Sequence, residues 1–202
     1  MAASDPNLSS EPPSTEAGAN LSASALDERL DEEIGRAERH DTQLSCLLVV
    51  IENLEDFSRE HGSELSGQTL AYVGAALQRE LRRFDRVGRA SERELLIVLP
   101  GADGPRGEIV ARRVLDRVRT IKVEADGTRR PLRISVGLAS WQQDSSAHDL
   151  LARARAATRR RNGNGNGDHG VGAAPAASWP GGSAEASAPE RSPSGLQRGG
   201  RS

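Results

Sequence analysis

The chain has 202 residues, 36% of them hydrophobic, and a formal net charge of −2, so it carries no general electrostatic attraction to nucleic acid. No apolar run approaches the roughly 20 residues needed to cross a bilayer, and the N-terminus lacks the basic and apolar regions of a signal peptide. The one cysteine, Cys46, excludes an intrachain disulfide framework or a thiolate metal cluster. We expect a cytoplasmic protein with neither nucleic-acid nor membrane partners.

Both ends of the chain are predicted to be disordered tails. Residues 1–23 are rich in Ser, Ala, Glu and Pro, and residues 162–202 run from an Asn-Gly repeat into Gly, Ala, Ser and Pro. Such segments carry too little apolar surface to offset the entropy lost on ordering. One folded domain is therefore expected over residues 24–161.

The first half of this domain predicts one strand and three helices. Apolar residues at helical spacing predict a helix over Ala25–His40. The continuous apolar run Cys46–Ile51 is typical of a strand buried on both faces. A short helix over Leu54–Glu60 and a longer one over Ser66–Arg83 follow.

A hairpin is predicted next. The short runs Asp85–Arg89 and Glu94–Leu99 are typical of strands and flank a polar tip at Ala90–Arg93. This hairpin would close one side of a nucleotide-sized cleft. Pro105 then suits the first turn of another helix.

The last part of the domain indicates its fold class. Asp126-Gly127 predicts a tight turn between the strands Ile121–Glu124 and Leu132–Ala139, and a final helix covers Ser146–Arg161. The order α-β-α-α-β-β-α-β-β-α favours an α+β fold, a ferredoxin-like antiparallel sheet with helices mainly on one face.

Residues 30–39 read Leu-Asp-Glu-Glu-Ile-Gly-Arg-Ala-Glu-Arg, and residues 135–139 read Ser-Val-Gly-Leu-Ala. These segments resemble the first-helix motif and the Ser-Ile-Gly-Ile-Ala motif of GGDEF domains, the diguanylate cyclase family that makes cyclic di-GMP from two GTP molecules. The positions of the Gly-Gly-(Asp/Glu)-Glu-Phe signature hold Ser91, Glu92, Arg93, Glu94 and Leu95. The resemblance covers about residues 27–161 and implies a nucleotide-cyclase-type sheet with flanking helices.

The same resemblance shows substitutions at the positions that serve catalysis in the family. The two metal-binding carboxylates fall on Val50 and Arg93, and neither is an oxygen ligand for magnesium. The next carboxylate position holds Glu52. The guanine-reading and phosphate-binding positions hold Ser58, Gly67, Asn162 and Asn166. We therefore expect no metal, no cofactor and no catalytic activity, so that the chain is not an enzyme.

One ligand-binding motif of the family is present. Arg82 and Asp85 fall on the Arg-x-x-Asp motif that forms the inhibitory product site, and Arg113 falls where the family carries a further arginine for the same ligand. An arginine can donate two hydrogen bonds to guanine O6 and N7, and an aspartate can accept from the guanine N1 and N2 donors. Arg106 and Arg112 could add phosphate contacts.

Three functions are consistent with these residues. The first is a catalytically inactive signalling domain that acts as a cyclic di-GMP receptor through Arg82 and Asp85. The second is a ligand-free interaction module that forms homodimers or docks on another signalling protein. The third is a residual enzyme that acts on GTP or another nucleotide. Two alternatives remain for single residues. Arg82 and Asp85 could belong to an ordinary surface helix end with no ligand. Arg93 could result from sequence drift at an abandoned site, or it could recognise a phosphate of a retained nucleotide.

Overall fold

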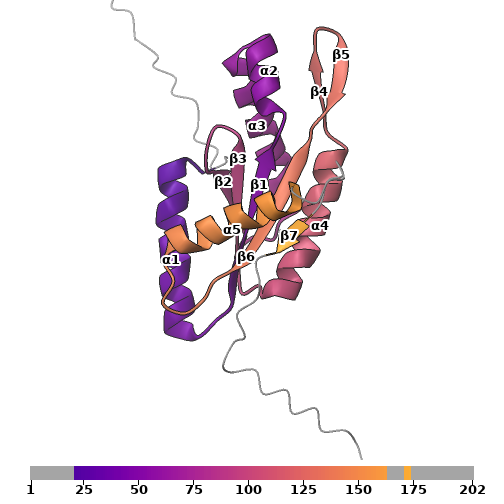
Figure 1. Ribbon diagram of the computed structural model, residues 1–202. Helices are drawn as coiled ribbons and strands as arrows, with labels where there is room; N and C mark the ends of the chain where they lie inside the picture. The colour runs from indigo at the N-terminus through magenta and orange to yellow at the C-terminus, as the bar shows by residue number, and fades with distance from the viewer. Residues whose placement is uncertain (1–20, 163–170, 174–202) are drawn as a thin grey trace, which may run out of the picture.

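The computed structural model describes residues 21–162 and 171–173 (Figure 1). Its elements follow the predicted order, with one additional hairpin strand and one additional strand near the C-terminus. They are α1 (Ala23–His40), β1 (Leu44–Ile51), α2 (Leu54–His61), α3 (Ser63–Gln78), β2 (Arg86–Arg89), β3 (Glu94–Pro100), α4 (Gly104–Arg119), β4 (Lys122–Ala125), β5 (Thr128–Pro131), β6 (Ile134–Ser140), α5 (Ala147–Asn162) and β7 (Val171–Ala173).

The main sheet has the strand order β2-β3-β1-β6-β7, with β1 at its centre. β1 pairs antiparallel with β3 and β6, so that Leu47 lies opposite Ile97 on one side and Leu138 on the other. All eight residues of β1 are buried, as its continuous apolar sequence predicts. The α+β fold and the antiparallel core of the sheet are confirmed.

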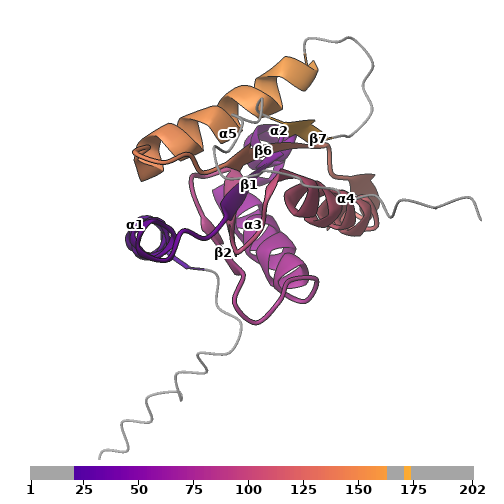
Figure 2. The ribbon, with the colours of Figure 1, turned by 90° about the horizontal axis from the view of Figure 1, so that it is seen from below.

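Helices cover both faces of the sheet, which corrects the expectation that they lie mainly on one face. Alternate residues of β1 point to opposite sides. Leu47 and Val49 join a cluster with α2, α3 and α4, whereas Leu48 and Val50 join one with α1 and α5. Figure 2 shows the resulting three layers. The sequence could not show which helices cover which face of the sheet, because a strand that is buried on both faces has no polar face.

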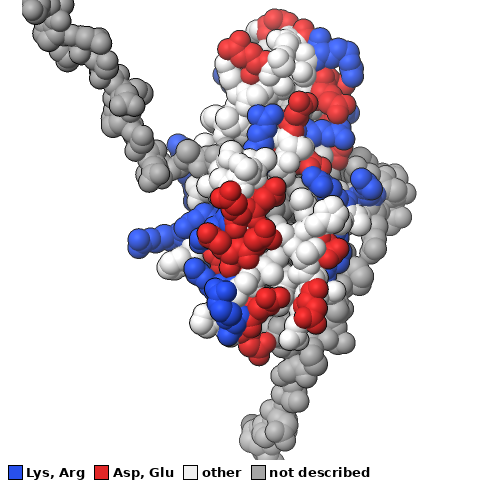
Figure 3. Space-filling model, turned by 90° about the vertical axis from the view of Figure 1, so that its left-hand side faces the viewer, with Lys and Arg blue, Asp and Glu red and all other residues white. Residues whose placement is uncertain are grey.

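The helix α1 shows the division between buried and exposed faces most clearly. Its stripe of Leu26, Leu30, Ile34 and Ala37 is buried against the sheet. Its outer face carries acidic side chains with arginines beside them, and Figure 3 shows this face of the molecule. This mixture of charges is typical of a helix face that meets solvent.

The predicted turn at Asp126-Gly127 is confirmed, but the strands around it differ from the prediction. Both residues have positive φ, 49° and 71°, as a two-residue hairpin turn requires. The turn joins β4 and β5 in a separate two-stranded sheet. The strand that follows the turn is therefore β5, which ends before Leu132, and the predicted strand Leu132–Ala139 corresponds to β6, which belongs to the main sheet.

Polar contacts attach the β4–β5 hairpin to α2. The Asn53 side chain donates to the Pro131 carbonyl at 3.1 Å and accepts from the Arg133 backbone N–H at 2.9 Å. His61 Nδ1 lies 3.1 Å from a carboxylate oxygen of Asp126. The hairpin is thereby fixed beside α2, beyond the end of α4 (Figure 1).

The helix α5 lies unusually close to β6 at Gly137. A Cβ atom on Gly137 would overlap the Ala154 carbonyl oxygen and lie 2.8 Å from the Thr158 Cγ2. Only glycine leaves space for the helix backbone at this crossing.

Some predicted boundaries shift, and β7 was not expected. α3 begins at Ser63 and ends at Gln78, leaving a turn before β2. Val171–Ala173, assigned to the C-terminal tail, instead pairs parallel with β6. The rest of the two predicted tails, apart from 21–23 and the end of α5, lies outside the described residues. No helix within the described ranges is long and apolar enough to cross a membrane.

Candidate ligand-binding site

The turn after α3 is held by reciprocal hydrogen bonds between Arg82 and Asp85. The Arg82 backbone N–H donates to Asp85 Oδ2 at 2.8 Å, and the Asp85 N–H donates to the Arg82 carbonyl at 3.1 Å. Asp85 is 5% exposed, whereas Arg82 is exposed. The turn thus has a fixed conformation that presents the arginine side chain at the surface.

This turn forms one wall of a cavity of about 180 Å³. The opposite wall is α4, which contributes Arg106, Ile109, Val110 and Arg113, and the end of β3 contributes Leu99 and Pro100. Arg82, Asp85 and Arg113, chosen from the sequence, therefore line one cavity. Arg106 lines it too, but Arg112, on a neighbouring face of α4, does not.

The cavity carries the charge of an anion-binding site. Three arginines and one carboxylate line it, which gives a formal charge of +2. Asp85 Oδ2 accepts the Arg82 N–H, so Oδ1 is the oxygen left for a ligand donor. The apolar residues at its base and rim suit a planar ring. Sequence reasoning missed Ile109, although its spacing from Arg106 and Arg113 places all three on one helix face.

Three of the signature residues, Ser91, Glu92 and Arg93, form the tip of the β2–β3 hairpin, at the end away from the Arg82–Asp85 turn, and the other two, Glu94 and Leu95, begin β3. Arg93 Nη1 lies 2.8 Å from Glu55 Oε1 on α2, and Glu94 Oε2 accepts from Arg155 on α5 at 2.8 Å. Leu95 is completely buried. Sequence reasoning missed both ion-pair partners.

A second cavity, of about 270 Å³, lies between this tip and α2. Ser91, Glu92 and Arg93 line it from the hairpin, and Glu55 and Ser58 line it from α2. Gly67, the other guanine-reading position, is in α3 but does not line this cavity. Asn162 ends α5, and Asn166 lies outside the described residues.

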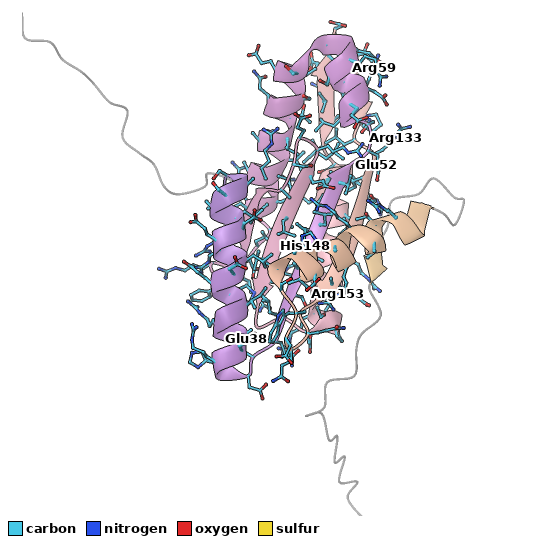
Figure 4. All side chains as sticks on the ribbon, turned by 60° about the vertical axis from the view of Figure 1, so that its left-hand side comes forward. Glu38, Glu52, Arg59, Arg133, His148 and Arg153 are labelled. Carbon is cyan, nitrogen blue, oxygen red and sulfur yellow. The ribbon has the colours of Figure 1, made fainter. Side chains whose placement is uncertain are left out.

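The side chains at the end of β1 do not fit a magnesium ion. Val50 packs in the cluster beneath α1 and α5, and the guanidinium of Arg93 carries a positive charge. Glu52, shown near Arg133 in Figure 4, accepts a hydrogen bond from the Ser135 hydroxyl. Across the described residues, no group of three or more His, Cys, Asp or Glu side chains is placed to hold a metal.

Comparison with known proteins decides the family. The family model "Diguanylate cyclase, GGDEF domain" matches residues 22–167. The chain belongs to the GGDEF-domain family. The diguanylate cyclase DgcP of Pseudomonas aeruginosa PAO1 is 21% identical over 130 residues, 64% of this chain but 19% of DgcP. This GGDEF domain thus spans about a fifth of that relative.

Solved GGDEF structures share the fold. Diguanylate cyclase SiaD of Pseudomonas aeruginosa, in complex with its activator SiaC, is 25% identical with a TM-score of 0.69, covering 75% of this chain and 58% of SiaD. The GGDEF domain of DgcB from Caulobacter crescentus, in complex with c-di-GMP, is 20% identical with a TM-score of 0.68, and the match covers 77% of this chain and 91% of the DgcB chain. The active GGEEF domain of a Vibrio cholerae diguanylate cyclase is 18% identical with a TM-score of 0.67, and the match covers 79% of this chain and 99% of the Vibrio cholerae chain.

These comparisons correct one expectation. The chain was expected not to be an enzyme, on the basis of Val50 and Arg93. The family that it matches consists of diguanylate cyclases, which are enzymes, and DgcP and SiaD are both diguanylate cyclases. The expectation of a non-enzyme is therefore wrong.

Proposed function

We propose that this GGDEF domain is a signalling domain that binds cyclic di-GMP in the cavity between the Arg82–Asp85 turn and α4. The observation that carries the proposal is that Arg82, Asp85 and Arg113, separated by up to 31 residues in sequence (113 − 82), line one cavity. Its formal charge of +2 and its apolar base match a ligand that combines phosphates with planar bases.

Each polar group has a task in this proposal. Arg82 donates two parallel hydrogen bonds to guanine O6 and N7, and Asp85 Oδ1 accepts from the guanine N1 and N2 donors. Arg113 and Arg106, which lie about two turns apart on the same face of α4, contact phosphate oxygens. That DgcB was solved with c-di-GMP supports the choice of ligand.

The cavity is small for the whole ligand, because typical ligand pockets have volumes of about 300–1,000 Å³. It takes one guanine and the adjoining phosphate, and the rest of the ligand projects outward. Two exposed apolar side chains, Phe84 at 68% and Ile109 at 61%, belong to the elements that form the cavity. They favour a second copy of the domain as the surface that covers the projecting half of the ligand.

The proposal is tested by calorimetric titration of the full chain with cyclic di-GMP, with and without magnesium. Cyclic di-AMP is the matched control, because adenine lacks the O6 acceptor and the N1 donor. We expect cyclic di-GMP to bind without magnesium and cyclic di-AMP to bind at least about tenfold more weakly. Equal affinity for the two, or no heat at high micromolar cyclic di-GMP, would refute the proposal. GTP titrated in parallel tests for a nucleotide in the cleft beside Arg93.

A further inference from the structure

A third cavity lies where α3, the end of α4 and the β4–β5 hairpin meet. Its volume is about 350 Å³, within the range of small-molecule sites. Tyr72 lines it from α3, Arg117 from α4, Ile121 from the loop after α4, Lys122 and Glu124 from β4, and Arg129 from β5. It shares no lining residue with the Arg82 cavity or with the cavity beside Arg93.

The charged side chains of this cavity are incompletely paired. Three cations and one carboxylate line it. The Arg117 Nε is buried and donates no hydrogen bond, with Glu80 Oε1 at 3.6 Å. Arg129 pairs with Glu124 at 3.4 Å, but both side chains are mostly exposed, so this pair contributes little stability. Among the described residues, the Lys122 ammonium has no hydrogen-bond or ion-pair partner.

The cavity also presents an aromatic ring. Tyr72 is 61% exposed, although tyrosine usually buries most of its ring. An exposed ring beside cations is the arrangement on which a base can stack while its phosphate meets positive charge.

We propose that this cavity is a second ligand site, which binds a small molecule carrying both a planar aromatic ring and a phosphate, the chemistry of a nucleotide. The ring stacks on Tyr72, and the phosphate accepts hydrogen bonds from Lys122 and Arg117. Arg129 exchanges its exposed contact with Glu124 for the phosphate. The site functions independently of the Arg82 cavity.

Two side chains of the cavity allow a direct test, because Tyr72 is the only tyrosine of the chain and Lys122 its only lysine. Protein labelled with ¹³C in the tyrosine ring therefore gives the signals of one ring. The full chain is titrated with 5′-GMP, with guanosine and with inorganic phosphate while these signals are followed. GMP should shift them, and the other two compounds should bind at least about tenfold more weakly, because each lacks one of the two contacts.

Variants separate this site from its surroundings. Lys122→Gln should weaken GMP binding about fivefold, whereas Lys122→Arg and the distant Arg39→Gln should leave it within about twofold. The shift should persist in Arg82→Ala, which alters the other cavity. Three results would overturn the proposal. The first is a Tyr72 ring signal that does not shift at millimolar GMP. The others are a GMP affinity in Lys122→Gln equal to that of the wild type and a shift that disappears in Arg82→Ala.

Discussion

Asp85 Oδ2 accepts a hydrogen bond of 2.8 Å from the backbone N–H of Arg82, and this nearly buried carboxylate thereby fixes the turn that presents the Arg82 side chain. The aspartate has two tasks in our proposal. One oxygen holds the turn and the other accepts from the ligand. Substitution can separate these tasks, because holding the turn needs one acceptor oxygen, whereas binding the ligand needs a second acceptor as well.

Replacing Asp85 tests this division. Asp85→Ala leaves the Arg82 N–H without its acceptor and should lower the free energy of unfolding by about 1–2 kcal/mol. Asp85→Asn retains an acceptor for that N–H and should cost less than half as much. Both variants should lose cyclic di-GMP affinity, because an amide NH₂ cannot accept from guanine. Urea unfolding and calorimetry measure the two effects, and a fully stable Asp85→Ala would show that the hydrogen bond does not hold the turn.

Arg82→Ala should weaken cyclic di-GMP binding by about ten- to a hundredfold, since a bidentate guanine contact contributes roughly 1–3 kcal/mol. Its stability should stay within about 0.5 kcal/mol of the wild type, because the side chain is exposed. Arg83→Ala is the matched control, a neighbouring exposed arginine that does not line the cavity. Equal losses in the two variants would mean that only the general positive charge of the turn attracts the ligand.

The parts of the structure that sequence could predict are those encoded by local patterns. The apolar run of β1, the helical stripes and the Asp126-Gly127 turn are of this kind. The spacing of Arg106, Ile109 and Arg113 also places one wall of the cavity on one helix face.

What sequence could not predict depends on packing between distant segments. The Arg93–Glu55 and Glu94–Arg155 pairs join residues 38 and 61 positions apart, and their geometry follows from how α2 and α5 pack. The three residues Val171–Ala173 have no strand pattern of their own, and they form a strand only because they pair with β6. The family was predicted correctly, but the inference from two substituted positions to a non-enzyme was wrong.

Two glycine substitutions should have opposite effects on stability. Gly137→Ala places a methyl group against the Ala154 carbonyl of α5 and should cost about 3 kcal/mol or more. Gly67→Ala, within α3, meets nothing within 4 Å and should increase stability by up to about 1 kcal/mol. Thermal unfolding distinguishes them. A tolerated Gly137→Ala would show that α5 does not lie this close to β6.

Arg93 should control metal binding in the cleft between the hairpin tip and α2. Arg93→Asp replaces a cation with a third carboxylate beside Glu55 and Glu92, so the affinity for Mn²⁺ should rise at least about tenfold. Water-proton relaxation measures bound Mn²⁺. Arg39→Asp makes the same charge change on α1, away from the cleft, and should leave the affinity within about twofold. If both variants gain equally, the effect comes from net charge and not from the cleft.

Cys46 should make stability fall at high pH. It is fully buried in the cluster beneath α1 and α5, and this burial raises the pKa of its thiol from 9.0 to about 12, with nearby Arg153 partly opposing the shift. Below pH 9 the thiol is protonated in both the folded and the unfolded chain and contributes no pH dependence. Between pH 9 and 12 the unfolded chain loses this proton while the folded chain keeps it. The folded state then binds more protons, so its stability falls by roughly 1.4 kcal/mol per pH unit.

Cys46→Ala isolates this contribution, because every other titrating group is common to both proteins. Urea unfolding of wild type and variant at pH 8, 9, 10 and 10.5 should give a constant difference in the free energy of unfolding up to about pH 9. Above that pH the wild type should lose stability faster than the variant. The buried thiol should also react with a thiol reagent at pH 8 only after unfolding, because neither reagent nor hydroxide reaches it in the folded state. Parallel stability profiles throughout, or rapid modification of the folded protein, would show that Cys46 is accessible to solvent and that α1 and α5 do not seal this face of the sheet.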